Sequence, residues 1–172
     1  MVVRWVALLT AAAAAAVSAT EAAAPQRLSF NCDAPPGELS TMDQDRLAGA
    51  NAISGNLRAI EGREDNNLNP TATVRLASHK DFVALQIAPT EHNSGRWVVL
   101  VRNGDAREEE RTLLGEVGLN ETMPFRVTRN GKDVIIEAAG RSVAVRQSFR
   151  GAPNMGVTCS TGHFLFDNLQ VQ

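Results

Sequence analysis

Short stretches in which apolar and polar residues alternate run through most of the chain, from about residue 51 to its end. In the stretch from Phe82 to Ala88, for example, Val83, Leu85 and Ile87 share one face and the residues between them share the other. A period of two is typical of β-strands with one buried face. Eight or more such stretches at short spacing, without a convincing helix, predict an all-β, antiparallel sandwich or barrel.

Turn residues separate these stretches. Asn130-Gly131 offers residues that accept a positive φ and predicts a two-residue type I′ hairpin. Asn103-Gly104 predicts a second hairpin, between residues 96–102 and 107–114, and Ala139-Gly140 predicts a further turn. The chain then closes on an alternating stretch from Phe164 to Val171, which we predict to be the last strand.

The region before residue 51 is less regular. Asp33 to Met42 contains Pro35-Pro36-Gly37 and predicts a loop, because these residues interrupt regular structure. Met42 to Ala50 could form one helical turn, which Gly49 keeps short. A first strand is predicted before the loop, at Leu28 to Asn31.

Residues 1–24 read as a targeting segment. Arg4 precedes an apolar, Ala-rich run from Val6 to Val17, and small residues follow up to Ala19. This pattern predicts a signal peptide cleaved after Ala19. The alternative is a retained membrane anchor, but the run is shorter than the 18 or so residues of a spanning helix. We therefore expect an exported protein, periplasmic or extracellular, with one β-sandwich domain over residues 25–172 and no transmembrane segment after signal removal.

The charge balance narrows the range of partners. Seventeen basic residues against nineteen acidic residues give a formal net charge of −2. Nucleic acids and anionic membrane surfaces call for clustered Lys and Arg, so we predict no nucleic-acid partner. The sequence leaves the oligomeric state open.

The C-terminal third resembles the concanavalin A-like lectin/glucanase superfamily, in particular its laminin-G-like and 3-keto-disaccharide hydrolase-like branches. The resemblance rests on the hairpin at Asn130-Gly131, the glycine-containing turn before Val157 and the final strand Phe164 to Val171. It is firmest from Pro124 to Val171 and extends more loosely back to about Leu28. It implies a jelly roll whose final strand lies beside the first.

Cys32 and Cys159 are the two cysteines of the chain. An even number of cysteines in an exported protein favours a disulfide. Cys32 follows the predicted first strand and Cys159 precedes the predicted last one. Because the resemblance implies that these strands are neighbours, we expect a Cys32–Cys159 disulfide. Buried free thiols are the alternative, and a metal site lacks companion ligands.

The resemblance also raises the possibility of glycoside hydrolysis, which needs two carboxylates flanking the scissile bond. The strand Asp81 to Ala88 looks like the one that carries an E-x-D-x-x-E pattern in laminarinase-type glucanases. Here that face holds Ala84 and Gln86 and no carboxylate, and Glu91 lies beyond Pro89. We therefore predict that the retaining glucanase mechanism is absent and assign no catalytic residue.

Other candidate sites in the sequence are weak. Glu108-Glu109-Glu110 could form a carboxylate pair, but a solvated strand face with ion pairs to nearby arginines explains it better. His79, His92 and His163 show no metal-ligand spacing, and no cofactor motif is present. We predict neither a metal nor a cofactor.

Glycan binding is the commonest non-catalytic role in the superfamily. Sugars usually stack on exposed Trp or Tyr. The chain has no Tyr, and Trp97 shares a strand face with Val99 and Val101, which predicts a place in the core. Any exposed binding face is therefore polar.

The candidate binding residues are Arg75, Gln86 and Arg96. Because side chains alternate across a strand, Arg75 and Gln86 point away from the core if their apolar neighbours are buried. The sequence does not decide on which face of its strand Arg96 lies, since apolar residues occur at both alternating sets of positions. Arginine and glutamine can hold a hydroxylated or anionic glycan, or they can be ordinary solvated strand residues. The sequence favours a non-catalytic binding or adhesion module for a glycan or cell-envelope polymer, with a glycoside-hydrolase-like enzyme or a structural envelope protein as alternatives.

Overall fold

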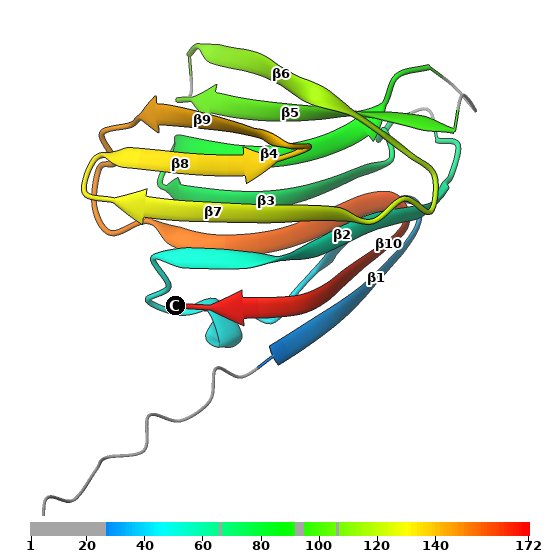
Figure 1. The fold of residues 1–172 in the computed structure, drawn as a ribbon, viewed down its shortest axis with the longest axis horizontal. Coiled ribbons are helices and arrows are strands. Elements are labelled where there is room, and N and C mark those ends of the chain that lie inside the picture. Colours follow the sequence, from blue (N-terminus) through cyan, green and yellow to red (C-terminus); the bar gives the residue numbers. More distant parts are fainter. Residues whose placement is uncertain (1–26, 66, 92–94, 106) are drawn as a thin grey trace, which may run out of the picture.

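The computed structural model describes residues 27–65, 67–91, 95–105 and 107–172, and this part of the chain consists almost entirely of β-strands (Figure 1). The expected signal peptide, its cleavage after Ala19, and His92 lie outside the described residues. Within the described ranges no helix is long and apolar enough to cross a membrane. The elements are β1 (Arg27–Thr41), η1 (Gln44–Leu47), β2 (Ala52–Gly62), β3 (Thr71–Ser78), β4 (Asp81–Pro89), β5 (Arg96–Gly104), β6 (Glu109–Gly118), β7 (Met123–Asn130), β8 (Asp133–Ala138), β9 (Arg141–Arg146) and β10 (Asn154–Val171).

The strands form one antiparallel ladder in the order β6-β5-β4-β3-β10-β2-β7-β8-β9, with β1 paired to β10. Residues 154–160 of β10 pair with β3, and residues 162–171 pair with β2. The ladder therefore folds over at the middle of β10 into two layers (Figure 1). We call β3–β6 with the first half of β10 the β4 layer, and β2 and β7–β9 with the second half of β10 the β7 layer. This is the antiparallel jelly-roll sandwich that the sequence predicts.

The hydrophobic core lies between the two layers. Val83, Leu85 and Ile87 of β4 are buried, as the alternation predicts. From the same layer Trp97 is 3% exposed, which confirms its place in the core. Its ring meets Phe164 of the β7 layer edge to face, with ring centroids 5.3 Å apart. Such an aromatic pair adds about 0.5–1.5 kcal/mol beyond the burial of its area.

The predicted start of the last strand is wrong, because β10 begins at Asn154 rather than Phe164. Thr161, with a φ of 49°, turns the strand from one layer to the other without ending its pairing. Gly162 follows because a Cβ there would lie 2.7 Å from the backbone oxygen of Glu61 and 2.9 Å from the Phe164 ring. The long last strand is thus shared by both layers.

The prediction of a loop from Asp33 to Met42 is also wrong, since most of these residues belong to β1. The residues around Pro35-Pro36-Gly37 interrupt the pairing with β10 only between Ala34 and Leu39. Pairing resumes at Leu39, now beside the first half of β10. β1 therefore follows β10 from the β7 layer into the β4 layer, as the resemblance implies for first and last strands.

Cys32 and Cys159 form the expected disulfide, with Cα atoms 6.1 Å apart. Cys32 pairs with Phe164 in the β7 layer, and Cys159 pairs with Ala72 in the β4 layer. The bond therefore ties the two layers together at the bend of β10. Both cysteines are buried.

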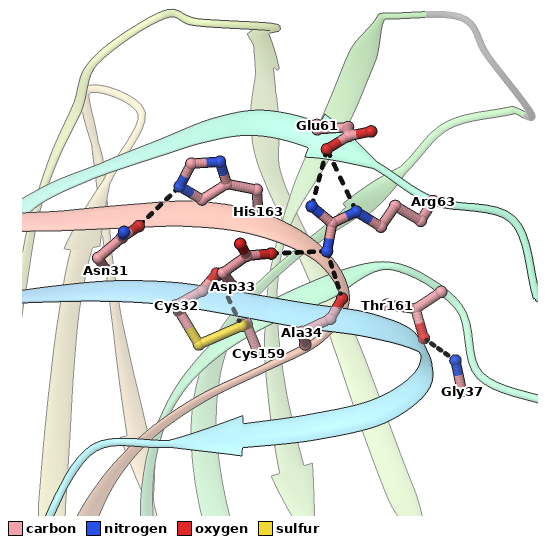
Figure 2. A network of polar contacts seen from close by, with 10 residues as sticks. All are labelled: Asn31, Cys32, Asp33, Ala34, Gly37, Glu61, Arg63, Cys159, Thr161 and His163. Carbon is pink, nitrogen blue, oxygen red and sulfur yellow. Dashed lines mark hydrogen bonds and ion pairs between the residues drawn. A yellow bond between two sulfur atoms is a disulfide. The ribbon is translucent and has the colours of Figure 1, made fainter.

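Arg63 fastens the chain after β2 to β1, beside the disulfide (Figure 2). Its Nη1 donates to Asp33 Oδ1 at 2.6 Å and to the backbone oxygen of Ala34 at 3.0 Å. Its Nε and Nη2 donate to Glu61 Oε2 at 3.2 and 3.0 Å. These hydrogen bonds, above all the one to Asp33, raise the pKa of Arg63. The network is structural, because it closes the end of the sandwich where β1 and β10 bend.

One of the three predicted turns is confirmed at the residues predicted for it. Ala139 and Gly140 both have a positive φ, of 50° and 71°, and join β8 to β9. The hairpin at Asn130-Gly131 is displaced by one residue, since Asn130 pairs with Asp133 and the loop consists of Gly131 and Lys132. The prediction of a type I′ turn centred on Asn130-Gly131 is therefore wrong.

The turn predicted at Asn103-Gly104 is also displaced. Both residues continue β5, and Gly104 pairs with Glu109, so the chain turns after Gly104 in a connection that includes Asp105, Arg107 and Glu108. Asp105 holds this turn, because its Oδ1 accepts hydrogen bonds from the backbone N–H groups of Arg107 and Glu108 at 2.7 and 3.2 Å. An Asp carboxylate bonded to the backbone two residues on is a strong turn former.

Candidate functional site

The outer face of the β4 layer carries Arg75 and Gln86, as predicted. Both residues lie between fully buried neighbours on their strands. Arg75 is exposed and Gln86 is partly exposed. Arg75 pairs with Ala84, two residues before Gln86, so the two predicted residues are diagonal neighbours on β3 and β4.

A chain of side-chain hydrogen bonds crosses this face from β3 to β6. Gln86 Nε2 donates to Thr73 Oγ1 at 3.2 Å, and Gln86 Oε1 accepts from Arg102 Nη1 at 3.1 Å. Arg102 in turn donates from Nε and Nη2 to the two carboxylate oxygens of Glu109, at 2.9 and 2.5 Å. Arg111 Nε donates to Glu109 Oε1 at 2.6 Å. Four neighbouring strands are thus linked through one polar network.

The carboxylate of Glu109 stays ionised in this network. Hydrogen bonds from Arg102, followed by those from Arg111, lower its pKa from 4.5 to about 2. An ionised carboxylate accepts hydrogen bonds and cannot act as a general acid. The network therefore presents donors to a ligand from its arginines, with Glu109 as their internal acceptor.

Phe82 packs against two of the guanidinium groups on this face. The Arg75 Cζ lies 5.0 Å and the Arg102 Cζ 5.8 Å from its ring centroid. Both distances fall within the range of cation–π attraction. The Arg75 side chain makes no hydrogen bond or ion pair with the described residues, and its guanidinium lies over the Phe82 ring.

Arg96 also belongs to the outer face but is remote from the other two candidates. Its side chain is 68% exposed, and its Nε donates to Glu116 Oε2 at 2.8 Å. It lies six residues before Arg102 on β5, about 20 Å along the strand. The structure therefore brings Arg75 and Gln86 together and leaves Arg96 apart, while ligand binding by all three stays a prediction.

The sequence interpretation missed Arg102, Glu109 and Arg111 as members of the site. Alternation alone would place Arg102 outward, since Trp97, Val99 and Val101 are buried. Its partners, however, depend on where the chain turns between β5 and β6. The register that brings Glu109 and Arg111 beside it follows from the turn that Asp105 holds between β5 and β6.

A second candidate is a cleft of about 910 Å³ beyond the β5–β6 turn, and it collects four carboxylates. Arg150 donates to Asp81 through its backbone N, Nε and Nη2 at 2.9, 3.1 and 3.0 Å, and these bonds lower the pKa of Asp81. Backbone N–H groups lower the pKa of Asp105 in the same way. The charged residues that line the cleft are Lys80, Asp81, Asp105, Arg107, Glu108, Glu110 and Arg150.

The remaining sequence candidates have structural roles or lie at the ends of strands. His163 is hydrogen-bonded to Asn31 at 2.6 Å (Figure 2), and His79 is exposed in the β3–β4 turn. Glu91 follows the end of β4 and lines a small cleft of about 210 Å³ with Trp97. Over the described ranges, no group of three His, Cys, Asp or Glu residues could hold a metal ion.

No protein-family model and no curated protein matches the chain. Among solved structures, an alginate lyase from Klebsiella pneumoniae has a TM-score of 0.53 and 12% identity, covering 70% of this chain and 59% of its own. A marine alginate lyase from Zobellia galactanivorans has a TM-score of 0.50 and 12% identity, with 70% and 60% covered. A galectin from Caenorhabditis elegans has a TM-score of 0.50 and 11% identity, with 84% and 95% covered.

These similarities establish the fold, which is that of the concanavalin A-like jelly-roll sandwiches. The chain spans about six tenths of the length of the alginate lyases that it matches.

Proposed function

We propose that this protein is an exported, non-catalytic binding module that holds a glycan or another cell-envelope polymer on the outer face of the β4 layer. The observation that carries the proposal is the hydrogen-bonded chain from Thr73 through Gln86 and Arg102 to Glu109. Its donors and acceptors are fixed by their neighbours before a ligand arrives, which reduces the entropic cost of binding. Arg75 and Gln86 make polar contacts to the polymer, and Arg96 extends the contact along β5.

Export to the periplasm or the cell exterior fits the same proposal. The disulfide is typical of proteins that fold in an oxidising compartment. The N-terminal segment has the composition of a signal peptide.

The fold is compatible with both binding and catalysis, because solved structures that share it include a galectin and alginate lyases. We favour binding because hydrolysis needs a carboxylic acid with a raised pKa beside a second carboxylate. On the outer face of the β4 layer, Glu109 has a lowered pKa and is held by two arginines. That arrangement suits recognition better than proton transfer.

The alternative function, a glycoside-hydrolase-like enzyme, would use the cleft beyond the β5–β6 turn. Carboxylates converge there, which is the observation in its favour. Asp81 and Asp105 are already bound by Arg150 and by backbone N–H groups, and their pKa values are lowered. A general acid would therefore have to be Glu108 or Glu110. A purely structural envelope protein would bind no glycan at all.

A glycan array tests the proposal directly, using protein that lacks the predicted signal peptide. We expect the wild type to bind at least one glycan class. The double variant Arg75→Ala/Gln86→Ala should bind that class about tenfold more weakly, the loss expected for one or two polar contacts. The matched control is Arg126→Ala/Thr128→Ala, a hydrogen-bonded pair on the outer face of the β7 layer, and it should bind like the wild type.

The outcomes separate the three functions. Unchanged affinity in a folded Arg75→Ala/Gln86→Ala protein would remove this face from consideration. Release of sugar from a bound glycan, abolished by Glu108→Gln or Glu110→Gln, would favour the enzyme. A complete lack of binding and hydrolysis would favour a structural role.

A further inference from the structure

Three arginines lie in one line across the outer face of the β4 layer. The strand register pairs Gly156 of β10 with Arg75, Arg75 with Ala84, Ala84 with Arg102, and Arg102 with Arg111. Paired residues of neighbouring strands point to the same side of a sheet. We call Arg75, Arg102 and Arg111 the arginine row. It runs across the strands: Ala84 lies between Arg75 and Arg102, Arg102 and Arg111 are direct neighbours, and Gly156 of β10 lies on the other side of Arg75.

The charges in the arginine row are not balanced. Glu109 is shared, because Arg102 and Arg111 both donate to it. Arg75 has no anionic partner among the described residues. Arg102 and Arg111 lie directly opposite each other on neighbouring strands. Like charges in this arrangement repel. The row is therefore a positive line on a chain whose formal net charge is −2.

The guanidinium groups of the row are held in place without a ligand. Phe82 supports Arg75 and Arg102 through cation–π contacts, and Gln86 holds Arg102 from the side of β4. Beside Arg75, Gly156 leaves open space, since a Cβ there would meet only the Arg75 backbone oxygen, at 3.9 Å. A planar guanidinium fork matches carboxylate and sulfate oxygens, and fixing it in advance favours binding.

We infer that the ligand of this face is a linear, polyanionic glycan that crosses the strands along the arginine row. This inference rests on the proposed function and specifies its ligand class. Neighbouring strands are about 4.8 Å apart, so the backbones of the arginine row, from Arg75 on β3 to Arg111 on β6, span about 14 Å. A polymer with a charge on successive sugars can contact the whole row, whereas a small anion covers only part of it. Carboxylate and sulfate groups supply the same recognition chemistry.

A nucleic acid is a poorer occupant of the row. Single strands bind basic grooves by stacking bases on aromatic rings. The exposed large apolar side chains of the described residues are Leu39, Leu113 and Leu119, none of them aromatic. Phe82, the aromatic residue of this face, already contacts two guanidinium groups.

The experiment compares glycans that share a backbone and differ in charge. Polygalacturonate is compared with its methyl-esterified form, and dextran sulfate with dextran, alongside an array of neutral, uronate, sulfated and phosphorylated glycans. We expect binding only to charged members, weakening as NaCl is raised. The first pair reports carboxylate recognition and the second reports sulfate recognition. Galacturonate monomer should compete poorly.

Two charge-matched variants locate the contact. Arg75→Gln/Arg111→Gln should weaken binding of the charged glycan by at least about tenfold, because each lost guanidinium removes a charge-assisted hydrogen bond. Arg126→Gln/Arg146→Gln removes the same charge from the outer face of the β7 layer and should leave the affinity unchanged. Thermal melting confirms that both proteins are folded.

The results distinguish this inference from the proposed function. Two results would contradict binding of a polyanion along the arginine row while still supporting glycan binding. One is binding only to neutral glycans, and the other is binding to charged glycans that Arg75→Gln/Arg111→Gln does not weaken. Binding to no glycan would overturn both. Tighter binding to a single-stranded oligonucleotide than to any glycan, weakened by Arg75→Gln/Arg111→Gln, would mean that the ligand of the arginine row is a nucleic acid.

Discussion

Arg102 on β5 binds Glu109 on β6 through both carboxylate oxygens, with Nε and Nη2 as the donors. A fork of this kind is the strongest form of a charged hydrogen bond, since two parallel bonds fix the orientation of both groups. The pair makes the stability of this layer depend on pH.

Acid should weaken the Arg102–Glu109 contact in a defined range. The pKa of Glu109 is lowered to about 2 in the folded protein, so its stabilising effect is complete above its usual value of 4.5 and is lost as the pH falls from there toward 2. We expect Glu109→Gln to cost about 1 kcal/mol in unfolding free energy at neutral pH, a difference that shrinks across this range. Denaturant unfolding at a series of pH values measures it. Glu137→Gln controls for the lost charge, and a pH-independent difference would contradict the prediction.

Gln86 should matter more for stability than Arg75. Gln86 is partly exposed and bonds both Thr73 and Arg102, whereas Arg75 contacts mainly the Phe82 ring. We expect Gln86→Ala to cost about 1 kcal/mol and Arg75→Ala less than about 0.5 kcal/mol. Thermal or chemical unfolding of the two single variants checks this order. A larger loss in Arg75→Ala would mean that its outward orientation is misassigned.

The disulfide should be complete in the native protein and inaccessible to reagents. Cys32 and Cys159 are 0% and 1% exposed, so we expect alkylation to label neither unless the protein is first denatured and reduced. Mass spectrometry of non-reduced protein is the measurement, and two labelled cysteines in freshly exported material would refute the bond. With a sequence separation of 127 between the cysteines, Cys32→Ala/Cys159→Ala should cost about 4–5 kcal/mol by the chain-entropy model.

Two glycines of β10 should differ in their sensitivity to the same substitution. At Gly162 a Cβ would lie 2.7 Å from a backbone oxygen, so Gly162→Ala should destabilise the protein by about 1–3 kcal/mol. At Gly156 the closest contact would be 3.9 Å away, and Gly156→Ala should be nearly neutral. Comparing the two unfolding midpoints tests the bend at Thr161. Equal effects would speak against it.

The protein should not hydrolyse β-glucans. Ala84 and Gln86 stand on the strand face where a retaining glucanase would need its carboxylates, and the structure confirms that this face points outward. We expect no reducing sugar from laminarin or lichenan, with an active glucanase as the positive control. Release that disappears in Glu91→Gln would show that a residue beyond β4 supplies the missing carboxylate.

Much of the fold follows from alternation alone. The parity of β3 and β4 places Arg75 and Gln86 correctly, because each strand has one face made of branched apolar residues. Trp97 is assigned to the core for the same reason. Period-two patterns report which face is buried, and they do so at every strand that has a clear apolar side.

Pairing partners are harder to obtain from the sequence. Asn103-Gly104 has the composition of a two-residue turn, yet the Asp105 carboxylate caps a later one and shifts the register of β6. A shifted register changes every cross-strand neighbour. This is why the contact of Arg102 with Glu109, and the arginine row itself, could not be predicted.

The strand limits near the bends were missed for a related reason. Thr161 changes the layer of β10 at a single residue, directly before Gly162, and strand pairing continues on both sides of it. Pro35-Pro36-Gly37 does mark a break in β1, but pairing resumes on the far side. Local composition identifies an interruption and does not reveal whether the partner strand continues past it.

The placement of the disulfide decides how the domain would respond to a pulling force. Arg27 and Gln170 are paired at one end of the β1–β10 ladder, so tension applied to the two described ends would open that ladder one pair at a time. Opening stops at the Cys32–Cys159 bond, which then carries the load. Of the described residues, 27–31 and 160–172 lie outside the covalent loop, and these are the ones that can extend. Everything between the cysteines, including the whole arginine row, would be shielded from the tension while the bond remains intact.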